Sequence, residues 1–130
     1  MEIFFQDPNE IPLPPQEVRI REIKAKPWPD GRRVHVYLEV DAFQKRPNIN
    51  LLISDAEGKE RATVSIIESM TRKIDLTMHL QGSAEGEFTL CAALFYLEEP
   101  EGEEKALPQN PIIIEKVEQK FRIDINPKGT

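Results

Sequence analysis

The sequence is poor in cysteine, glycine and aromatic residues: its 130 residues include one cysteine, Cys91, six glycines and 7% aromatic residues. A single cysteine excludes an intramolecular disulfide, so the fold must be held by its apolar core. No apolar run approaches the roughly 20 residues that a membrane-spanning helix needs. The first residues lack a basic segment followed by a long apolar one, so we expect no secretory signal and a cytoplasmic location.

Positive charge is also scarce, since 17 Lys and Arg face 23 Asp and Glu for a net charge of −6. Phosphate backbones and anionic lipid surfaces repel such a chain, so we expect no nucleic-acid and no membrane partner. The 39% hydrophobic and 31% charged residues are typical of a soluble globular protein. At this length the chain forms one domain that buries roughly two-thirds of its unfolded surface.

Motifs of catalysis and cofactor binding are absent. The sequence contains no His-Glu-x-x-His, no Gly-x-Ser-x-Gly and no complete phosphate-binding loop. Cys91 lies in an apolar segment, where desolvation raises the pKa of a thiol and makes it a poor nucleophile. We therefore expect no enzymatic activity and no cofactor.

The segment 1–16 differs from the rest because it holds four of the eleven prolines, which predicts an extended arm. The arm also carries Ile3, Phe4 and Phe5, which are costly to leave in water. We expect these side chains to pack on apolar surface, either of their own domain or of a partner. Residues 17–126 are the predicted β-sandwich, and residues 127–130 are a C-terminal tail.

From Glu17 onward, apolar and polar residues alternate with the period of half-buried strands. The clearest strand places Val34, Val36, Leu38 and Val40 on one face. A change of parity at residues 21–22 predicts a β-bulge in the preceding strand. The other expected strands centre on residues 49–53, 62–66, 74–80, 87–97 and 117–125. Strands at this spacing, separated by turn residues, predict an all-β antiparallel sandwich of about seven strands.

The segment Ile74–Leu80, a short turn and the segment Gly86–Leu90 resemble the fifth-to-sixth-strand corner of immunoglobulin-like and fibronectin type III-like modules. The resemblance covers residues 17–125. The chain departs from antibody-type domains because it has one cysteine, because Trp28 lies in the first turn, and because Phe88 stands where a corner tyrosine would be. The resemblance implies an architecture and no particular function, because such folds host many functions.

The two histidines suggest a metal site. His35 and His79 lie on the polar faces of the second and fifth strands, which are neighbours in an immunoglobulin-like order. A register that sets them opposite each other would also set Glu39 opposite Asp75, and this donor set suits zinc. The alternative is a solvated sheet face, which we favour because no third ligand follows at a diagnostic spacing. A metal-dependent enzyme or small hydrolase is accordingly the least favoured function.

The same strand order gathers three loops at one end of the sandwich: Phe43–Asn48, Glu68–Arg72 and Glu98–Pro111. Loops on a rigid scaffold often carry recognition residues. The candidates, three at this end and one at the opposite end, are Lys45, Arg46, Arg72 and Trp28. The alternatives are mutual neutralisation of basic and acidic loops in solvent, and a Trp28 that packs over the edge of the core.

The sixth strand is apolar on both faces. Phe88, Leu90, Ala92 and Leu94 take one face, and Cys91, Ala93 and Phe95 take the other. A strand with one side in water should alternate, so we expect the outer face of its sheet to be covered by the arm or by another subunit. This pattern predicts a non-enzymatic protein-interaction or accessory module that binds a protein partner or self-associates as a homodimer. A module that binds a small ligand or carbohydrate is the alternative.

Overall fold

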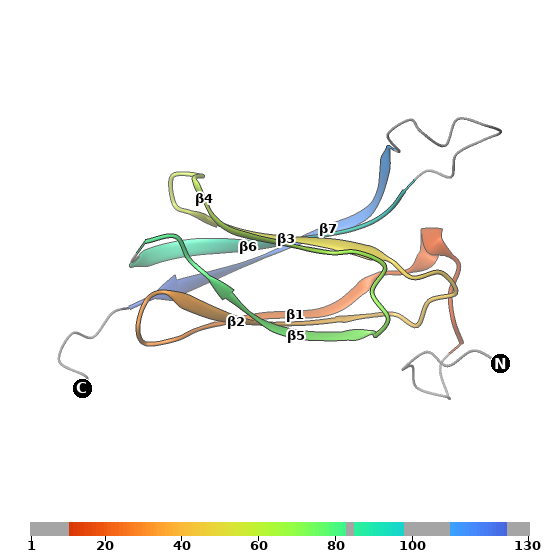
Figure 1. Ribbon diagram of the computed structural model, residues 1–130, viewed down its shortest axis with the longest axis horizontal. Helices are drawn as coiled ribbons and strands as arrows, with labels where there is room; N and C mark the ends of the chain where they lie inside the picture. Colours follow the sequence, from red (N-terminus) through yellow and green to blue (C-terminus); the bar gives the residue numbers. More distant parts are fainter. Residues whose placement is uncertain (1–10, 83–84, 98–109, 125–130) are drawn as a thin grey trace.

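The computed structural model describes residues 11–82, 85–97 and 110–124. Its seven strands are β1 (Ile20–Pro27), β2 (Arg33–Val40), β3 (Asn48–Asp55), β4 (Glu60–Ile66), β5 (Lys73–His79), β6 (Gly86–Leu97) and β7 (Pro111–Ile123), preceded by a 3₁₀ turn, η1 (Pro15–Glu17). They form two antiparallel sheets, ordered β1-β2-β5 and β4-β3-β6-β7, which lie face to face (Figure 1). The predicted all-β sandwich is confirmed. No described helix has the length and apolarity to cross a bilayer.

The core lies between the two sheets and is built by the alternation seen in the sequence. All four inward side chains of β2, from Val34 to Val40, are fully buried, while the residues between them are partly exposed. Leu51 of β3 and Leu90 of β6 are fully buried on the facing sheet and belong to the same cluster. Burial of each such side chain stabilises the fold by roughly 1.5–3 kcal/mol.

The predicted bulge in the first strand is confirmed. Ile20 pairs with Val40, but Glu22 pairs with Glu39, so β1 has one residue more than β2 at this point. Because of the extra residue, the side chains that point to the core change from even to odd positions between Ile20 and Ile23. Both isoleucines therefore pack against the core.

The second and fifth strands are neighbours, as predicted, but the predicted register is wrong by two residues. His35 lies opposite Thr77, and His79 lies opposite Arg33. A shift of two residues keeps every side chain on the same face of the sheet, so the polar faces alone do not distinguish the two registers. The observed register is the one that sets Val34 beside Met78 in the core.

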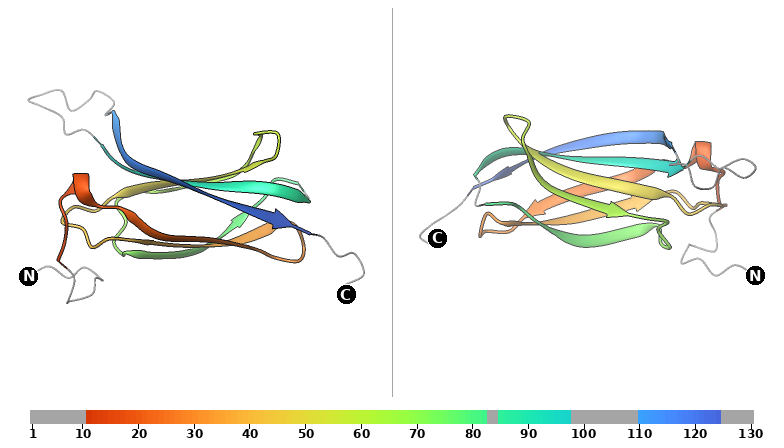
Figure 2. Two further views of the ribbon diagram at one scale, coloured as in Figure 1. Left: turned by 180° about the vertical axis from the view of Figure 1, so that it is seen from behind. Right: turned by 45° about the horizontal axis from the view of Figure 1, so that its top comes forward.

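The two ends of the sandwich differ. The "turn end" carries the β1–β2, β3–β4 and β5–β6 turns, and the "loop end" carries the loops 41–47 and 67–72 together with the last residue of β6 and the first of β7 (Figures 1 and 2). Leu13 ties the lead-in segment to the loop end, because its N–H donates to the Ala42 carbonyl at 2.9 Å and its carbonyl accepts from Gln44 N–H at 2.9 Å. Ile3, Phe4 and Phe5 of the predicted arm lie outside the described residues.

Candidate functional site

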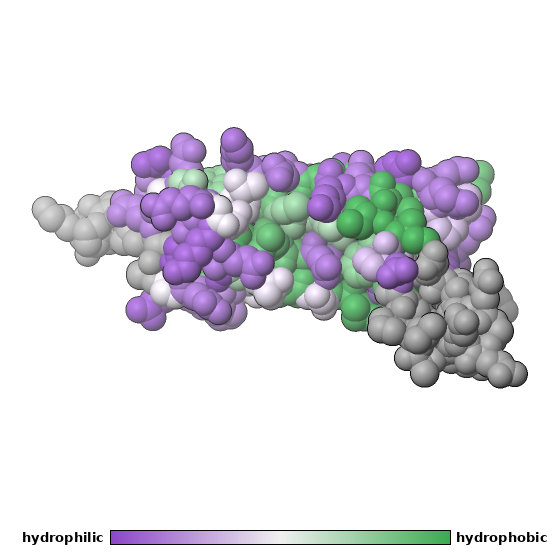
Figure 3. All heavy atoms as spheres, turned by 90° about the horizontal axis from the view of Figure 1, so that it is seen from above, coloured by the Kyte–Doolittle hydropathy of each residue, from purple (hydrophilic) through white to green (hydrophobic). Residues whose placement is uncertain are grey.

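The outer face of the four-stranded sheet carries a continuous line of apolar residues. Leu52 of β3 pairs with Cys91 of β6, and Phe95 of β6 pairs with Ile113 of β7, so these side chains share the side opposite the core. We call the set Leu52, Cys91, Ala93, Phe95, Leu97 and Ile113 the outer stripe. Figure 3, which looks onto this sheet, shows hydrophobic surface along the middle of the face between hydrophilic borders.

Exposure varies along the outer stripe. Cys91 and Ala93 are half-buried, and Phe95 is only 8% exposed within the single chain. Leu97 and Ile113, where β6 and β7 reach the loop end, are 37% and 51% exposed. The Phe95 side chain is therefore already covered, and the part open to a partner is the Leu97–Ile113 end.

Polar residues border the stripe on both sides. On the β4 side, Ser65 Oγ donates to Asn50 Oδ1 at 2.7 Å. On the β7 side, the outward residues Lys116, Glu118 and Lys120 are exposed and alternate in sign. An apolar centre with a polar rim is the usual composition of a protein interface.

Cys91 lies in the middle of the stripe and is a poor nucleophile. Desolvation is the main cause that raises the pKa of its thiol, and the Glu118 carboxylate raises it further, against a smaller opposing effect of Lys116. The thiol is therefore protonated at neutral pH, as its apolar segment predicts.

Arg72 lies inside the protein and presents no guanidinium to the loop-end surface. It is 5% exposed; its Nε donates to the Val40 carbonyl at 3.1 Å, and its Nη2 lies 3.2 Å from the Glu39 carboxylate. The structure thus brings two of the three predicted basic residues to the loop-end surface. The Lys45 ammonium lies 5.9 Å from the Tyr96 ring centroid, and Arg46 Nη2 lies 3.7 Å from Glu68 Oε1.

Two residues that the sequence did not single out hold the loops against the end of β6. Asn48, 4% exposed, donates through Nδ2 to the Phe95 carbonyl at 3.3 Å and accepts the Glu68 N–H at 2.9 Å. The Tyr96 hydroxyl donates to the Lys45 carbonyl at 2.9 Å, and desolvation raises the pKa of Tyr96 to about 12. The burial of Asn48 could not be predicted from the sequence, because an asparagine after a proline is typical of a turn.

Exposed apolar side chains gather at the loop end. Among the described residues, the large exposed hydrophobics are Ile11, Trp28, Ile67, Met70, Leu97, Ile112 and Ile113. All of these except Trp28 belong to the lead-in segment, the 67–72 loop or the ends of β6 and β7 at the loop end. The loop end therefore combines the open part of the outer stripe with further apolar surface.

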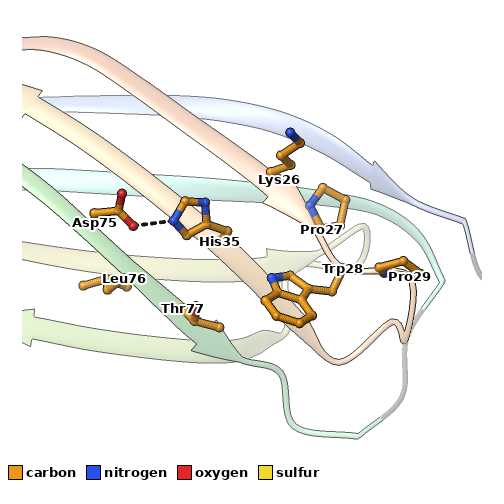
Figure 4. Close-up of a pocket in the computed structure, with 8 residues that line it drawn as sticks. All are labelled: Lys26, Pro27, Trp28, Pro29, His35, Asp75, Leu76 and Thr77. Atoms are coloured by element: carbon orange, nitrogen blue, oxygen red, sulfur yellow. Dashed lines mark hydrogen bonds and ion pairs between the residues drawn. The ribbon is translucent and has the colours of Figure 1, made fainter.

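At the turn end, Trp28 lies between two prolines and is 40% exposed. Its backbone N–H donates to the Arg33 carbonyl at 2.8 Å, and the Arg33 guanidinium carbon lies 3.9 Å from the centroid of its ring. The ring lines a shallow pocket on the outer side of the three-stranded sheet, drawn in Figure 4. The lining residues are Lys26, Pro27, Trp28, Pro29, His35, Asp75, Leu76 and Thr77.

The histidines do not form a metal site together. His35 Nε2 bonds the Asp75 carboxylate, whereas His79 lies opposite Arg33, one residue pair further along the same face of the strands. Within the described ranges, no three His, Cys, Asp or Glu side chains are grouped so as to hold a metal ion.

Comparison with known proteins adds no assignment. No protein-family model matches the chain, and no curated protein matches it as a relative. Two surfaces of the described residues are candidates for binding, the outer stripe and the Trp28 pocket.

Proposed function

We propose that this chain is a non-enzymatic interaction module that self-associates as a homodimer through the outer stripe. The observation that carries the proposal is the pair Leu97 and Ile113, which extend the stripe at 37% and 51% exposure. Covering such side chains gains about 25 cal/mol for each Å² of apolar surface removed from water. A two-fold dimer doubles this gain because each copy contributes the same patch.

The charges beside the stripe favour a second copy as the partner. Lys116, Glu118 and Lys120 alternate along the outward side of β7. A border of mixed charges repels a second copy less than a border of one sign would, although it adds little affinity.

We further propose that the sandwich is an immunoglobulin-like module of the fibronectin type III-like kind. In the constant-type immunoglobulin order, the fourth strand joins the sheet of the first, second and fifth strands. Here β4 pairs with β3, so the sheets are β1-β2-β5 and β4-β3-β6-β7. This exchange of the fourth strand supports the fibronectin type III-like alternative.

Size-exclusion chromatography with light scattering tests self-association, and two neighbouring isoleucines supply a matched pair of variants. Ile113 lies on the outer stripe, whereas Ile112, at 47% exposure, pairs with Tyr96 and points to the other side of the same strand. The wild type should be a dimer at high micromolar concentration. Ile113→Lys should be a monomer, and Ile112→Lys should remain a dimer.

Two outcomes contradict the proposal. A wild-type chain that stays monomeric at high micromolar concentration excludes the homodimer. Equal effects of Ile112→Lys and Ile113→Lys, in variants that keep the wild-type circular dichroism spectrum, place the contact elsewhere than the outer stripe.

A further inference from the structure

We infer that the Trp28 pocket is a second binding site, independent of the dimer surface, which takes a pyranose ring of a neutral oligosaccharide. The pocket lies at the turn end, opposite the exposed part of the outer stripe. Its volume is about 610 Å³, within the range of about 300–1,000 Å³ that is usual for small-molecule sites. Three features of the pocket favour a sugar ring: Trp28 is held rigidly, its ring borders the pocket, and polar groups surround it.

Trp28 is held in place by the turn that carries it. Pro27 and Pro29 fix their own backbone φ angles, and the Gly31 N–H closes the turn on the Trp28 carbonyl at 3.2 Å. Arg33 packs on the ring, and its Nε is held in turn by Asp30 Oδ2 at 2.9 Å. Because the Trp28 side chain is already ordered, a ligand that stacks on its ring costs less side-chain entropy than one that binds a mobile side chain.

One side of the ring faces the pocket. Arg33 is not among the residues that line the pocket, so the part of the indole that borders the pocket is not the part that its guanidinium covers. Figure 4 shows the ring beside Thr77 and below His35. The face of an aromatic ring carries partial negative charge, which attracts the partially positive C–H groups on the apolar face of a sugar ring.

The polar lining carries both donors and acceptors. Lys26 offers an ammonium group, Thr77 a hydroxyl, and Asp75 a carboxylate that is 63% exposed. A cation would be repelled by the Lys26 ammonium, while an anion would be repelled by the Asp75 carboxylate. Neighbouring sugar hydroxyls donate and accept together, so a neutral polyol satisfies this mixed set best.

A second depression extends the site along the same face. It shares Lys26 and His35 with the Trp28 pocket and reaches Tyr37 on β2. His35 and Tyr37 are two residues apart on one strand face, a separation of roughly 7 Å, which is of the size of one sugar unit. The groove therefore has room for more than one ring, and we expect longer oligosaccharides to bind more tightly than disaccharides.

The test uses the full chain and its intrinsic fluorescence, because Trp28 is the single tryptophan. The probes are cellohexaose, xylohexaose and mannohexaose, with cellobiose as the short probe. At least one hexasaccharide should change the Trp28 emission in a saturable way and show saturation-transfer NMR signals. Its affinity should exceed that of the matching disaccharide several-fold, and Trp28→Ala should lose the NMR signals while keeping the wild-type circular dichroism spectrum.

Two threonines provide matched variants. Thr77 lines the pocket, and Thr63 is an exposed threonine on the outer face of the other sheet. Thr77→Val should weaken binding about tenfold, the effect of one lost hydrogen bond, and Thr63→Val should leave it unchanged.

Three outcomes overturn the inference. The first is that none of the hexasaccharides perturbs Trp28 or gives NMR signals at millimolar concentration. The second is that Thr63→Val and Thr77→Val weaken binding equally. The third is that a decaproline peptide binds at Trp28 while the saccharides do not. The last outcome makes the pocket a peptide site. The dimer test is unaffected by all three, because its variants lie at the opposite end of the sandwich.

Discussion

Replacement of Arg72 by alanine is expected to lower the free energy of unfolding by about 3 kcal/mol, although the residue lies beside an ordinary surface loop. The side chain is 5% exposed and makes two charge-assisted hydrogen bonds, to the Val40 carbonyl at 3.1 Å and to the Glu39 carboxylate at 3.2 Å. Each bond of this kind contributes about 1.5 kcal/mol. Glu39 keeps 20% exposure, so its carboxylate stays partly hydrated, and the loss stays below the upper end of the range of about 3–5 kcal/mol for a fully buried pair.

Urea unfolding followed by circular dichroism measures the effect, and thermal unfolding should show a decrease in Tm of about 10 °C. Arg72→Met keeps most of the apolar packing and removes both hydrogen bonds, so it should lose nearly as much as Arg72→Ala. The exposed neighbour Lys73 is the control, and Lys73→Ala should change stability by less than about 0.5 kcal/mol. A loss below about 1 kcal/mol for Arg72→Ala would refute the reasoning that its guanidinium is a structural part of the β2–β5 junction.

Two further predictions concern titratable groups. Hydrogen bonds from the Lys59 and Glu57 amides and the Arg61 guanidinium hold the pKa of Asp55 below its ordinary value, against desolvation. Because its folded-state pKa is lowered, the ionised Asp55 stabilises the protein above pH about 4, and this stabilisation is lost as the pH falls through the folded-state pKa. The free energies of unfolding in urea at pH 5 and pH 3 should therefore differ less in Asp55→Asn than in the wild type. The thiol of Cys91 should react with Ellman's reagent at pH 8 about tenfold more slowly than free cysteine and faster as the pH rises, and equal rates in folded protein and free cysteine would contradict its raised pKa.

The architecture could be predicted from the sequence because a strand that is buried on one side shows alternating apolar and polar residues. The four buried residues of β2 alternate without a break from Val34 to Val40, and the bulge in β1 is visible as a shift of that alternation. Both features depend only on neighbours along the chain. The register between β2 and β5 depends on the outward residues as well, and the polar pairs around His35 favour no alignment strongly enough to be read in advance.

Buried polar groups could not be predicted because their partners are distant in sequence. Arg72 bonds a carbonyl 32 residues away, and Asn48 bonds one 47 residues away. In a loop, each of these residue types is normally solvated, so composition alone assigns both to the surface.

The outer stripe was predictable only in part. Cys91 and Ala93 revealed it because β6 is apolar on both sides. Its exposed end at Ile113 depends on a bulge between Leu94 and Phe95 that shifts the pairing with β7. Among three consecutive isoleucines, either the middle one or the two flanking ones could point to the outer face, so the sequence did not show which of them joins the stripe.

The direction of the outermost strands has a mechanical consequence. β1 and β7 lie side by side and both run from the loop end to the turn end (Figure 2). A pulling force that enters through the lead-in segment and leaves after Ile123 therefore acts along the strands. The hydrogen bonds between β6 and β7, which join residues from Gly86 to Leu97 with Ile123 back to Pro111, are then loaded together in shear and cannot open one after another. Pulled in this direction, the sandwich should resist extension far more than the same sandwich peeled apart from one end.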